Sequence, residues 1–258
     1  MKIHPSAIIH PKAEIGADVE IGPFAYVGEH ARIGRGTKIL HHGVVEGHTE
    51  IGENNEIGSF SVIGGKPQDL KYKGEPTKLI IGNNNLFREN VTVNTGTVTG
   101  TGVTKIGNNC LIMAYAHVAH DCEVGNHVIM ANYTGLSGHV ILEDYVILSG
   151  MVGVVQFARV GKYAFIGGQS GIDKNVAPYV IGVGNRLQIR GINMVGLKRR
   201  GFDETRIRTI LDAYKIFFDS GKEKVDALAE LEEKFGTKED IRYFIDFIKN
   251  SGKQGISR

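Results

Sequence analysis

An apolar residue recurs every six positions through most of the first 172 residues of this chain. The series runs from Ile3 to Ile63, resumes at Ile81, Phe87 and Val93, and continues from Ile106 to Ile172. An α-helix has a period of about 3.6 residues, so it cannot keep such a series on one face. Six residues fit one short strand and a corner, and three such units close a triangular coil that pairs with the next coil. The repeat therefore predicts a parallel β-helix.

Glycine makes up 35 of the 258 residues, about twice its usual share, without the spacing of collagen. It often follows the apolar residue of the repeat directly, as at Gly16, Gly34 and Gly52. Because glycine adopts positive φ without steric cost, we expect these residues at the tight corners between strands.

The six-residue pattern changes from Pro178 onward. Residues 203–220 place apolar side chains on one helical stripe, with Asp203 as the expected N-cap and Gly221 as the stop. Residues 222–235 and 238–250 are also typical of amphipathic helices. We therefore predict a β-helix over residues 1–185 and a C-terminal helical domain over residues 186–258. The second part is mildly basic, which suits an acidic partner.

Two cysteines, Cys110 and Cys122, are too few for a disulfide framework. No stretch approaches the roughly 18 uninterrupted apolar residues of a membrane span, and no basic-then-apolar leader opens the chain. We expect a cytoplasmic protein with no membrane insertion and no nucleic-acid partner.

His120 is the candidate catalytic residue because the repeat aligns it with other polar positions. Adding one coil of three six-residue units to His120 reaches Gly138, and adding another reaches Gln156, so these residues should stack on one edge. Histidine titrates near neutral pH and suits a general base. Asp121 could orient its ring, and the Gly138 N–H could stabilise an oxyanion.

The clustered histidines also permit a different chemistry. His117, His120 and His139 could supply three imidazoles to a catalytic zinc, the ligand set of trimeric β-helical carbonic anhydrases. No carboxylate or thiol completes such a site in an obvious way. We therefore expect no metal and no cofactor.

The first break in the repeat, residues 66–76, has the sequence KPQDLKYKGEP. A loop that leaves a regular prism is not required by the fold, so it is a candidate binding arm. The alternative is an insertion that the fold merely tolerates.

Together these motifs resemble the UDP-N-acetylglucosamine O-acyltransferases, the family that begins lipid A synthesis in Gram-negative bacteria. The resemblance covers nearly the whole chain. It includes the QDLKY segment at residues 68–72, HVAHDC at 117–122, GHV at 138–140, QF at 156–157, PY at 178–179 and GLKRRGF at 196–202. It implies a left-handed β-helix and a homotrimer whose active sites lie between subunits.

The resemblance also implies an activity and residue roles. The family transfers an (R)-3-hydroxyacyl chain from acyl carrier protein to the glucosamine 3-hydroxyl of a UDP-sugar. His120 is then the general base, Asp121 its orienting residue and Gly138 the oxyanion donor. Gly168 would mark the far end of the acyl groove, and Arg199 and Arg200 would meet the diphosphate. The implied substrate-binding residues are Gln68, Asp69, Lys71, Tyr72, His117, His139, Gln156, Gly168, Asn193, Arg199 and Arg200.

Four positions depart from the common family pattern: Val155, Val195, Arg186 and the Asn94 to Gly96 segment. Some relatives acylate a 3-amino sugar and form an amide, so ester and amide products both stay open. Two other hypotheses are a hexapeptide acetyltransferase that uses acetyl-CoA and a catalytically silent solenoid.

Overall fold

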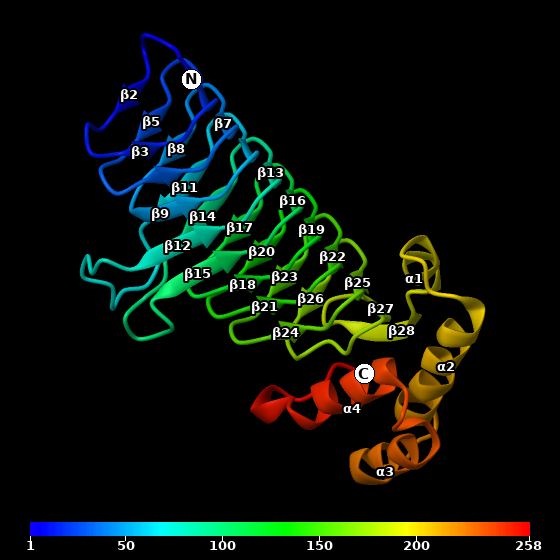
Figure 1. Cartoon of the computed structure of the whole chain (residues 1–258). Helices are drawn as coiled ribbons and strands as arrows, with labels where there is room; N and C mark the ends of the chain where they lie inside the picture. The colour runs from blue at the N-terminus through cyan, green and yellow to red at the C-terminus, as the bar shows by residue number, and fades with distance from the viewer.

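Three sheets of short parallel strands run along the N-terminal part of the chain, as the six-residue repeat predicts (Figure 1). The computed structural model describes residues 1–258. Up to residue 172 consecutive strands pass from sheet A to sheet B to sheet C, and every third strand returns to the same sheet. The chain is therefore a parallel β-helix with three faces and three edges.

Within each sheet the strands stack in chain order along the β-helix. Sheet A contains β1 (Lys2–Ile3), β4 (Glu20–Ile21), β7 (Lys38–Ile39), β10 (Glu56–Ile57), β13 (Leu86–Phe87), β16 (Leu111–Ile112), β19 (Ile129–Met130), β22 (Ile147–Leu148), β25 (Phe165–Ile166), β27 (Val180–Val183) and β28 (Gln188–Ile192). Sheet B contains β2 (Ile8–Ile9), β5 (Tyr26–Val27), β8 (Val44–Val45), β11 (Val62–Gly65), β14 (Thr92–Asn94), β17 (His117–Val118), β20 (Gly135–Leu136), β23 (Gly153–Val154) and β26 (Gly171–Ile172). Sheet C contains β3 (Glu14–Ile15), β6 (Arg32–Ile33), β9 (His48–Ile51), β12 (Lys78–Ile81), β15 (Val103–Ile106), β18 (Glu123–Val124), β21 (Ile141–Leu142) and β24 (Arg159–Val160).

The register of the sheets follows the repeat in the sequence. Leu136 pairs with Val154 one coil later, and both are buried in the core. Where residues 66–77 interrupt the repeat, Ile63 pairs with Val93 instead, so the insertion leaves the prism while the core stays continuous. From Ile21 to Ile172 the predicted apolar series is the buried core of the β-helix, whereas Ile3, Ile9 and Ile15 at its open end are partly or largely exposed.

The glycines of the repeat have a different role from the one we expected. The corners with positive φ are mostly occupied by other residues, such as Tyr115 and Tyr133. Gly34 and Gly52 do not have positive φ, but a Cβ on Gly34 would lie 2.4 Å from the Gly52 carbonyl oxygen. Because stacked coils leave no room for a side chain there, glycine is selected by close packing between backbones.

The C-terminal helices agree with the sequence pattern, with one addition. They are α1 (Met194–Arg199), α2 (Glu204–Tyr214) with a π-helical turn at Lys215–Asp219, α3 (Lys224–Phe235), α4 (Glu239–Lys249) and a 3₁₀ turn at Gly252–Gln254. The Asp203 carboxylate accepts from the Arg206 N–H at 2.7 Å, so the N-cap prediction is confirmed. Gly221 has φ of 71°, which suits the predicted stop.

The boundary between the two parts is less sharp than a division at residue 185 implies. Strand β28 lies beyond that residue and pairs antiparallel with β27 in sheet A. The helices then pack on the last coils: the Tyr179 hydroxyl donates to Asp240 at 3.1 Å, and the Asn175 amide donates to the Ser251 carbonyl at 2.7 Å. A division into two domains stays a prediction.

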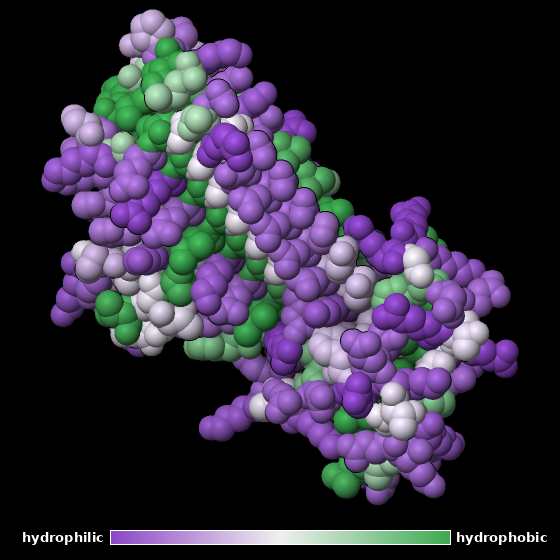
Figure 2. Space-filling model, in the orientation of Figure 1, coloured by the Kyte–Doolittle hydropathy of each residue, from purple (hydrophilic) through white to green (hydrophobic).

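The outer surface differs between the two parts. In the space-filling view a strip of apolar residues follows the length of the β-helix, whereas the helical part is mainly hydrophilic (Figure 2). None of the helices combines the length and apolar character needed to cross a bilayer. Cys110 and Cys122 are free thiols buried in the core.

Candidate active site

His120, Gly138 and Gln156 stack on the edge between sheets B and C, as the coil length predicted. They follow β17, β20 and β23 respectively, each one coil apart. A Cβ built on Gly138 would lie 2.7 Å from His120 Nε2 and 3.1 Å from Gln156 Nε2. The Gly138 N–H itself donates to no backbone acceptor. The edge therefore presents an imidazole nitrogen and a free backbone donor side by side.

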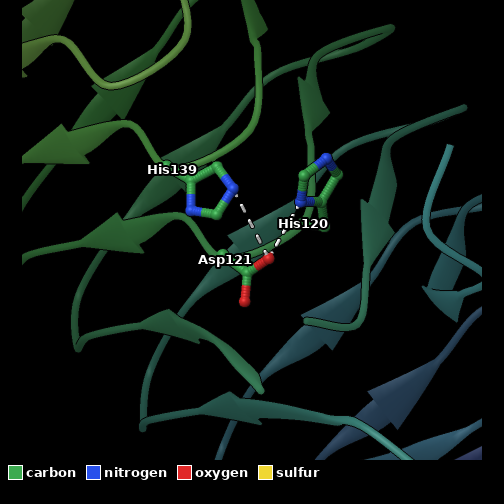
Figure 3. A group of neighbouring side chains, drawn as sticks. All are labelled: His120, Asp121 and His139. Atoms are coloured by element: carbon green, nitrogen blue, oxygen red, sulfur yellow. Dashed lines mark hydrogen bonds and ion pairs between the residues drawn. The ribbon is translucent and has the colours of Figure 1, made fainter. Parts of the chain in front are cut away.

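His120 and Asp121 form a buried, hydrogen-bonded pair (Figure 3). His120 Nδ1 lies 2.9 Å from Asp121 Oδ2, and His139 Nε2 lies 3.9 Å from the same oxygen on its other side. The side chains of His120 and Asp121 are 7% and 0% exposed. The His139 ring meets the His120 ring edge-on and stacks on Phe157, with centroids 4.5 Å apart. Asp121 therefore lies where the predicted orienting role requires it, in contact with the Nδ1 side of the ring.

The ionisation of Asp121 determines which nitrogen of His120 is free. Burial alone would raise the pKa of this carboxyl group, but hydrogen bonds from Thr97, His120 and Thr101 outweigh burial and hold the pKa below its ordinary value. Asp121 is therefore a carboxylate at neutral pH and can only accept. The proton of neutral His120 then lies on Nδ1, so Nε2 carries the lone pair of a base.

The two neighbouring histidines stay neutral near pH 7. Burial lowers the pKa of His117, and burial also lowers the pKa of His139 despite the nearby Asp121 charge. His117 Nδ1 is hydrogen-bonded to the Thr92 hydroxyl at 2.7 Å. Both side chains therefore offer hydrogen bonds to a ligand rather than positive charge.

A metal could in principle use part of this cluster. Potential ligand atoms of His120, Asp121 and His139 lie within 4.8 Å of one another, whereas His117 is not part of the group. The set therefore differs from the three-histidine arrangement that the sequence permits. The Asp121 oxygens are also occupied by donors from Thr97 and Thr101, which a metal would have to displace.

The inserted loop reaches toward this edge. The Asp69 charge acts on His139, while the Asp69 side chain also accepts from the Lys71 N–H at 2.9 Å. Gln68 and Lys71 are exposed, and the Tyr72 hydroxyl donates to the Glu75 carbonyl within the loop. The loop thus has its own internal order and offers free polar side chains beside the histidines.

The remaining predicted residues lie on the other two edges of the same chain. Gly168 lies between β25 and β26, on the edge between sheets A and B. Arg200 stacks over Tyr145 at 4.8 Å, on the edge between sheets C and A, and Arg199 is exposed beside it at the end of α1. Asn193 caps α1 and donates to the Tyr163 carbonyl, so its amide is already used within the chain.

Sequence reasoning missed the threonines that surround Asp121. Thr97 and Thr101 belong to an irregular stretch between β14 and β15 that carries no motif for a catalytic residue. Only the place of this stretch in the sequence pointed to a role, because this break in the repeat directly precedes the coil that contains His120.

Comparisons with known proteins agree on one family. The family model described as "Udp N-acetylglucosamine O-acyltransferase; Domain 2" matches residues 175–257, and a bacterial transferase hexapeptide model matches residues 103–138. The chain is 45% identical over 198 residues to the acyl-[acyl-carrier-protein]--UDP-N-acetylglucosamine O-acyltransferase of Anaeromyxobacter sp. (strain Fw109-5), with 77% of each chain covered. The enzyme of that name from Burkholderia lata is 45% identical over 203 residues, also with 77% of each chain covered.

Solved structures extend the likeness over the full length. LpxA, a UDP-N-acetylglucosamine acyltransferase from Bacteroides fragilis, superposes with a TM-score of 0.95 at 43% identity and 99% coverage of both chains. LpxA from Acinetobacter baumannii superposes with a TM-score of 0.96 at 44% identity, again with 99% of both chains covered. The chain therefore belongs to the UDP-N-acetylglucosamine O-acyltransferase family and is an acyltransferase.

Proposed function

We propose that the protein transfers an (R)-3-hydroxyacyl chain from acyl carrier protein to the 3-hydroxyl of UDP-N-acetylglucosamine, the first step of lipid A synthesis. The names of its relatives supply the two substrates. The main observation in support of this reaction is the position of His120 Nε2, which carries a lone pair in this tautomer. It lies next to Gly138, whose N–H donates to no backbone acceptor. Acyl transfer needs a base for the acceptor hydroxyl and a donor for the oxyanion.

In the proposed mechanism, His120 Nε2 takes the proton from the sugar 3-hydroxyl as its oxygen attacks the thioester carbonyl carbon. The Gly138 N–H donates to the tetrahedral oxyanion, and Asp121 stabilises the imidazolium. Collapse of this intermediate breaks the carbon–sulfur bond. The thiolate of the carrier then takes the proton back from Nε2, so the enzyme returns to its starting state.

The contacts with substrate are proposed from the family resemblance and from where these residues lie in the structure. His117, His139 and Gln156 would hold the sugar beside the base, and the loop residues Asp69 and Lys71 would meet the acyl hydroxyl or the sugar. Gln68 would offer a further polar contact to substrate, and Tyr72 would support the loop through its hydrogen bond to the Glu75 carbonyl. Arg199 and Arg200 would meet the diphosphate, with Asn193 holding α1 in place, and Gly168 would leave room for the acyl end. The basic C-terminal part would dock the acidic carrier protein.

The assembly that we propose is a homotrimer. The predicted substrate residues lie on all three edges of one chain, so one compact site would need groups from more than one copy. The edge between sheets A and B also carries exposed apolar side chains: Tyr115 and Tyr133 stack at 4.9 Å and are about half exposed, with Met151 in the next coil. Sheet C instead carries exposed ion pairs such as Lys105–Glu123. Apolar rows favour contact with another copy.

Tyr133→Arg is expected to break this assembly because it places a charge against the apolar surface of the neighbour. Light scattering should detect dissociation toward single chains, and turnover should fall by at least about tenfold with it. Ile80→Arg is the matched control, since Ile80 is 38% exposed in β12 of sheet C, the face that carries the exposed ion pairs. A Tyr133→Arg protein that stays trimeric and active would exclude this edge as the interface.

The proposed reaction is tested by mass spectrometry of the product formed from mixed 3-hydroxyacyl carrier protein thioesters and UDP-N-acetylglucosamine. A 3-O-hydroxyacyl sugar nucleotide is the expected product. A second reaction contains the 3-amino sugar nucleotide instead. If product forms only there, as an amide, the 3-amino sugar nucleotide replaces UDP-N-acetylglucosamine as the acceptor. Turnover with acetyl-CoA but with no carrier thioester would contradict the proposal.

A further inference from the structure

The loop between β14 and β15 encloses the carboxylate of Asp121. The N–H of Thr97 is shared between both carboxylate oxygens at 3.1 Å, and its hydroxyl donates to Oδ2 at 2.6 Å. Thr101 donates to Oδ1 through its N–H at 2.9 Å, and the single proton of its hydroxyl lies between Oδ1 at 3.1 Å and the Val103 carbonyl at 2.8 Å. The N–H of Asp121 itself donates to the Thr104 hydroxyl at 2.8 Å. Three threonines therefore fix this residue.

The loop is closed tightly over the carboxylate. The N–H groups of Gly100 and Gly102 both donate to the Thr97 carbonyl, at 3.1 and 3.0 Å, which folds the loop back on itself. A Cβ on Gly100 would lie 2.4 Å from the Asp121 carboxyl carbon and 2.5 and 2.6 Å from its oxygens. No side chain fits at that position while the carboxylate stays where it is.

These contacts leave Asp121 with one orientation. Each oxygen already accepts from the loop, and the remaining direction at Oδ2 is taken by His120 Nδ1 at 2.9 Å. A carboxylate accepts about four hydrogen bonds, so this group has little capacity for other donors. Rotation of the carboxylate would break bonds to Thr97 and Thr101 in a buried place, where unpaired charge is costly. The loop therefore sets the direction from which Asp121 holds the imidazole.

We propose that Thr97 and Thr101 are positioning residues of the acyl-transfer reaction, which act through Asp121 to hold His120 Nε2 toward the Gly138 N–H. The inference rests on the proposed role of His120 as the base. Neither threonine has an assigned role in substrate binding, so their effect belongs to the chemical step. At metal sites, residues that orient a ligand side chain in this way contribute about 10- to 100-fold to affinity or activity.

The test is Thr97→Val and Thr101→Val, singly and together, assayed in the full-length trimer. The double variant should lose roughly 10- to 100-fold in kcat with little change in KM. Thr97→Ser keeps the hydroxyl and should restore most of the activity. Thr99→Val makes the same chemical change at an exposed position of the loop, where the hydroxyl meets Thr97 Oγ1 at 3.3 Å but does not contact Asp121, and it should be close to wild type.

Two measurements separate positioning from a general structural role. In an Asp121→Asn background the threonine substitutions should cause little further loss, because they act through the residue already changed. The acid limb of the pH profile of kcat/KM should also move to higher pH. With fewer donors, the Asp121 carboxylate holds the proton of the imidazolium more strongly, so the protonated, inactive form persists to higher pH. His139 is the other titratable side chain that faces this carboxylate, so the profile is repeated with His139→Asn.

The outcomes also distinguish this inference from the proposed function. If the wild-type protein turns over and His120→Ala does not, but the double valine variant is as active as wild type, the positioning role is wrong and the function stands. The positioning role would also be wrong if the activity lost through the threonine substitutions adds fully to the activity lost in Asp121→Asn. If the wild-type protein transfers no acyl chain from carrier protein, the proposed function itself fails.

Discussion

Replacing His120 with alanine is expected to lower kcat/KM by about 10²- to 10⁴-fold, the range that a general base contributes. The variant removes Nε2, the one basic nitrogen beside the free Gly138 N–H, and leaves the oxyanion donor in place. Residual turnover should therefore remain above the uncatalysed rate, as in hydrolases that have lost the base but kept the oxyanion hole. Initial rates with carrier thioester and UDP-N-acetylglucosamine measure the effect.

The control for this variant is His30→Ala. His30 lies on the same edge between sheets B and C, is exposed, and stacks on His48 near the N-terminal end of the β-helix. It makes no contact with the candidate site, so its removal should leave kcat/KM unchanged. Circular dichroism and the oligomeric state should match wild type for both variants. A His120→Ala protein with near-normal turnover would remove His120 from the mechanism.

The repeat made the catalytic edge predictable because its period is fixed by the backbone. A strict coil length aligns His120 with Gly138 and Gln156 whatever the side chains are, and the structure confirms this stack. The same argument placed the core and the interruption at residues 66–76. Periodicity thus predicts which residues share an edge, even though it names no substrate.

The irregular segments could not be predicted in this way. The contacts of Thr97 and Thr101 depend on how a loop without a period folds back, and no repeat sets its register. Helix α1 was not predicted as a separate element because six residues are too few to show an amphipathic period. Glycine was assigned to corners from its conformational freedom, whereas close approach of stacked backbones explains Gly34. Tertiary packing decided each of these cases.

Replacing Gly138 with alanine is expected to lower kcat by about 10²-fold, the loss that follows when a catalytic group moves by roughly 1 Å. The new methyl group would lie 2.5 Å from His120 Cε1 and 2.7 Å from Nε2, closer than side-chain atoms approach one another. Since Gly138 does not have positive φ, alanine can adopt its backbone conformation and the coil should still form. The backbone N–H is also kept, so the loss reports the displaced imidazole.

Two comparisons make this interpretation specific. Gly28→Ala is the matched control on the same edge, because its Cβ would meet its nearest neighbours at 3.4 Å, an ordinary contact distance. The double variant His120→Ala/Gly138→Ala should lose no more than His120→Ala alone, since the methyl group then has no ring to displace. A further loss in the double variant would show that the methyl group blocks the acyl chain or the oxyanion instead. Glycine would then be needed at this position to admit substrate, and the space beside His120 would belong to the thioester rather than to the imidazole.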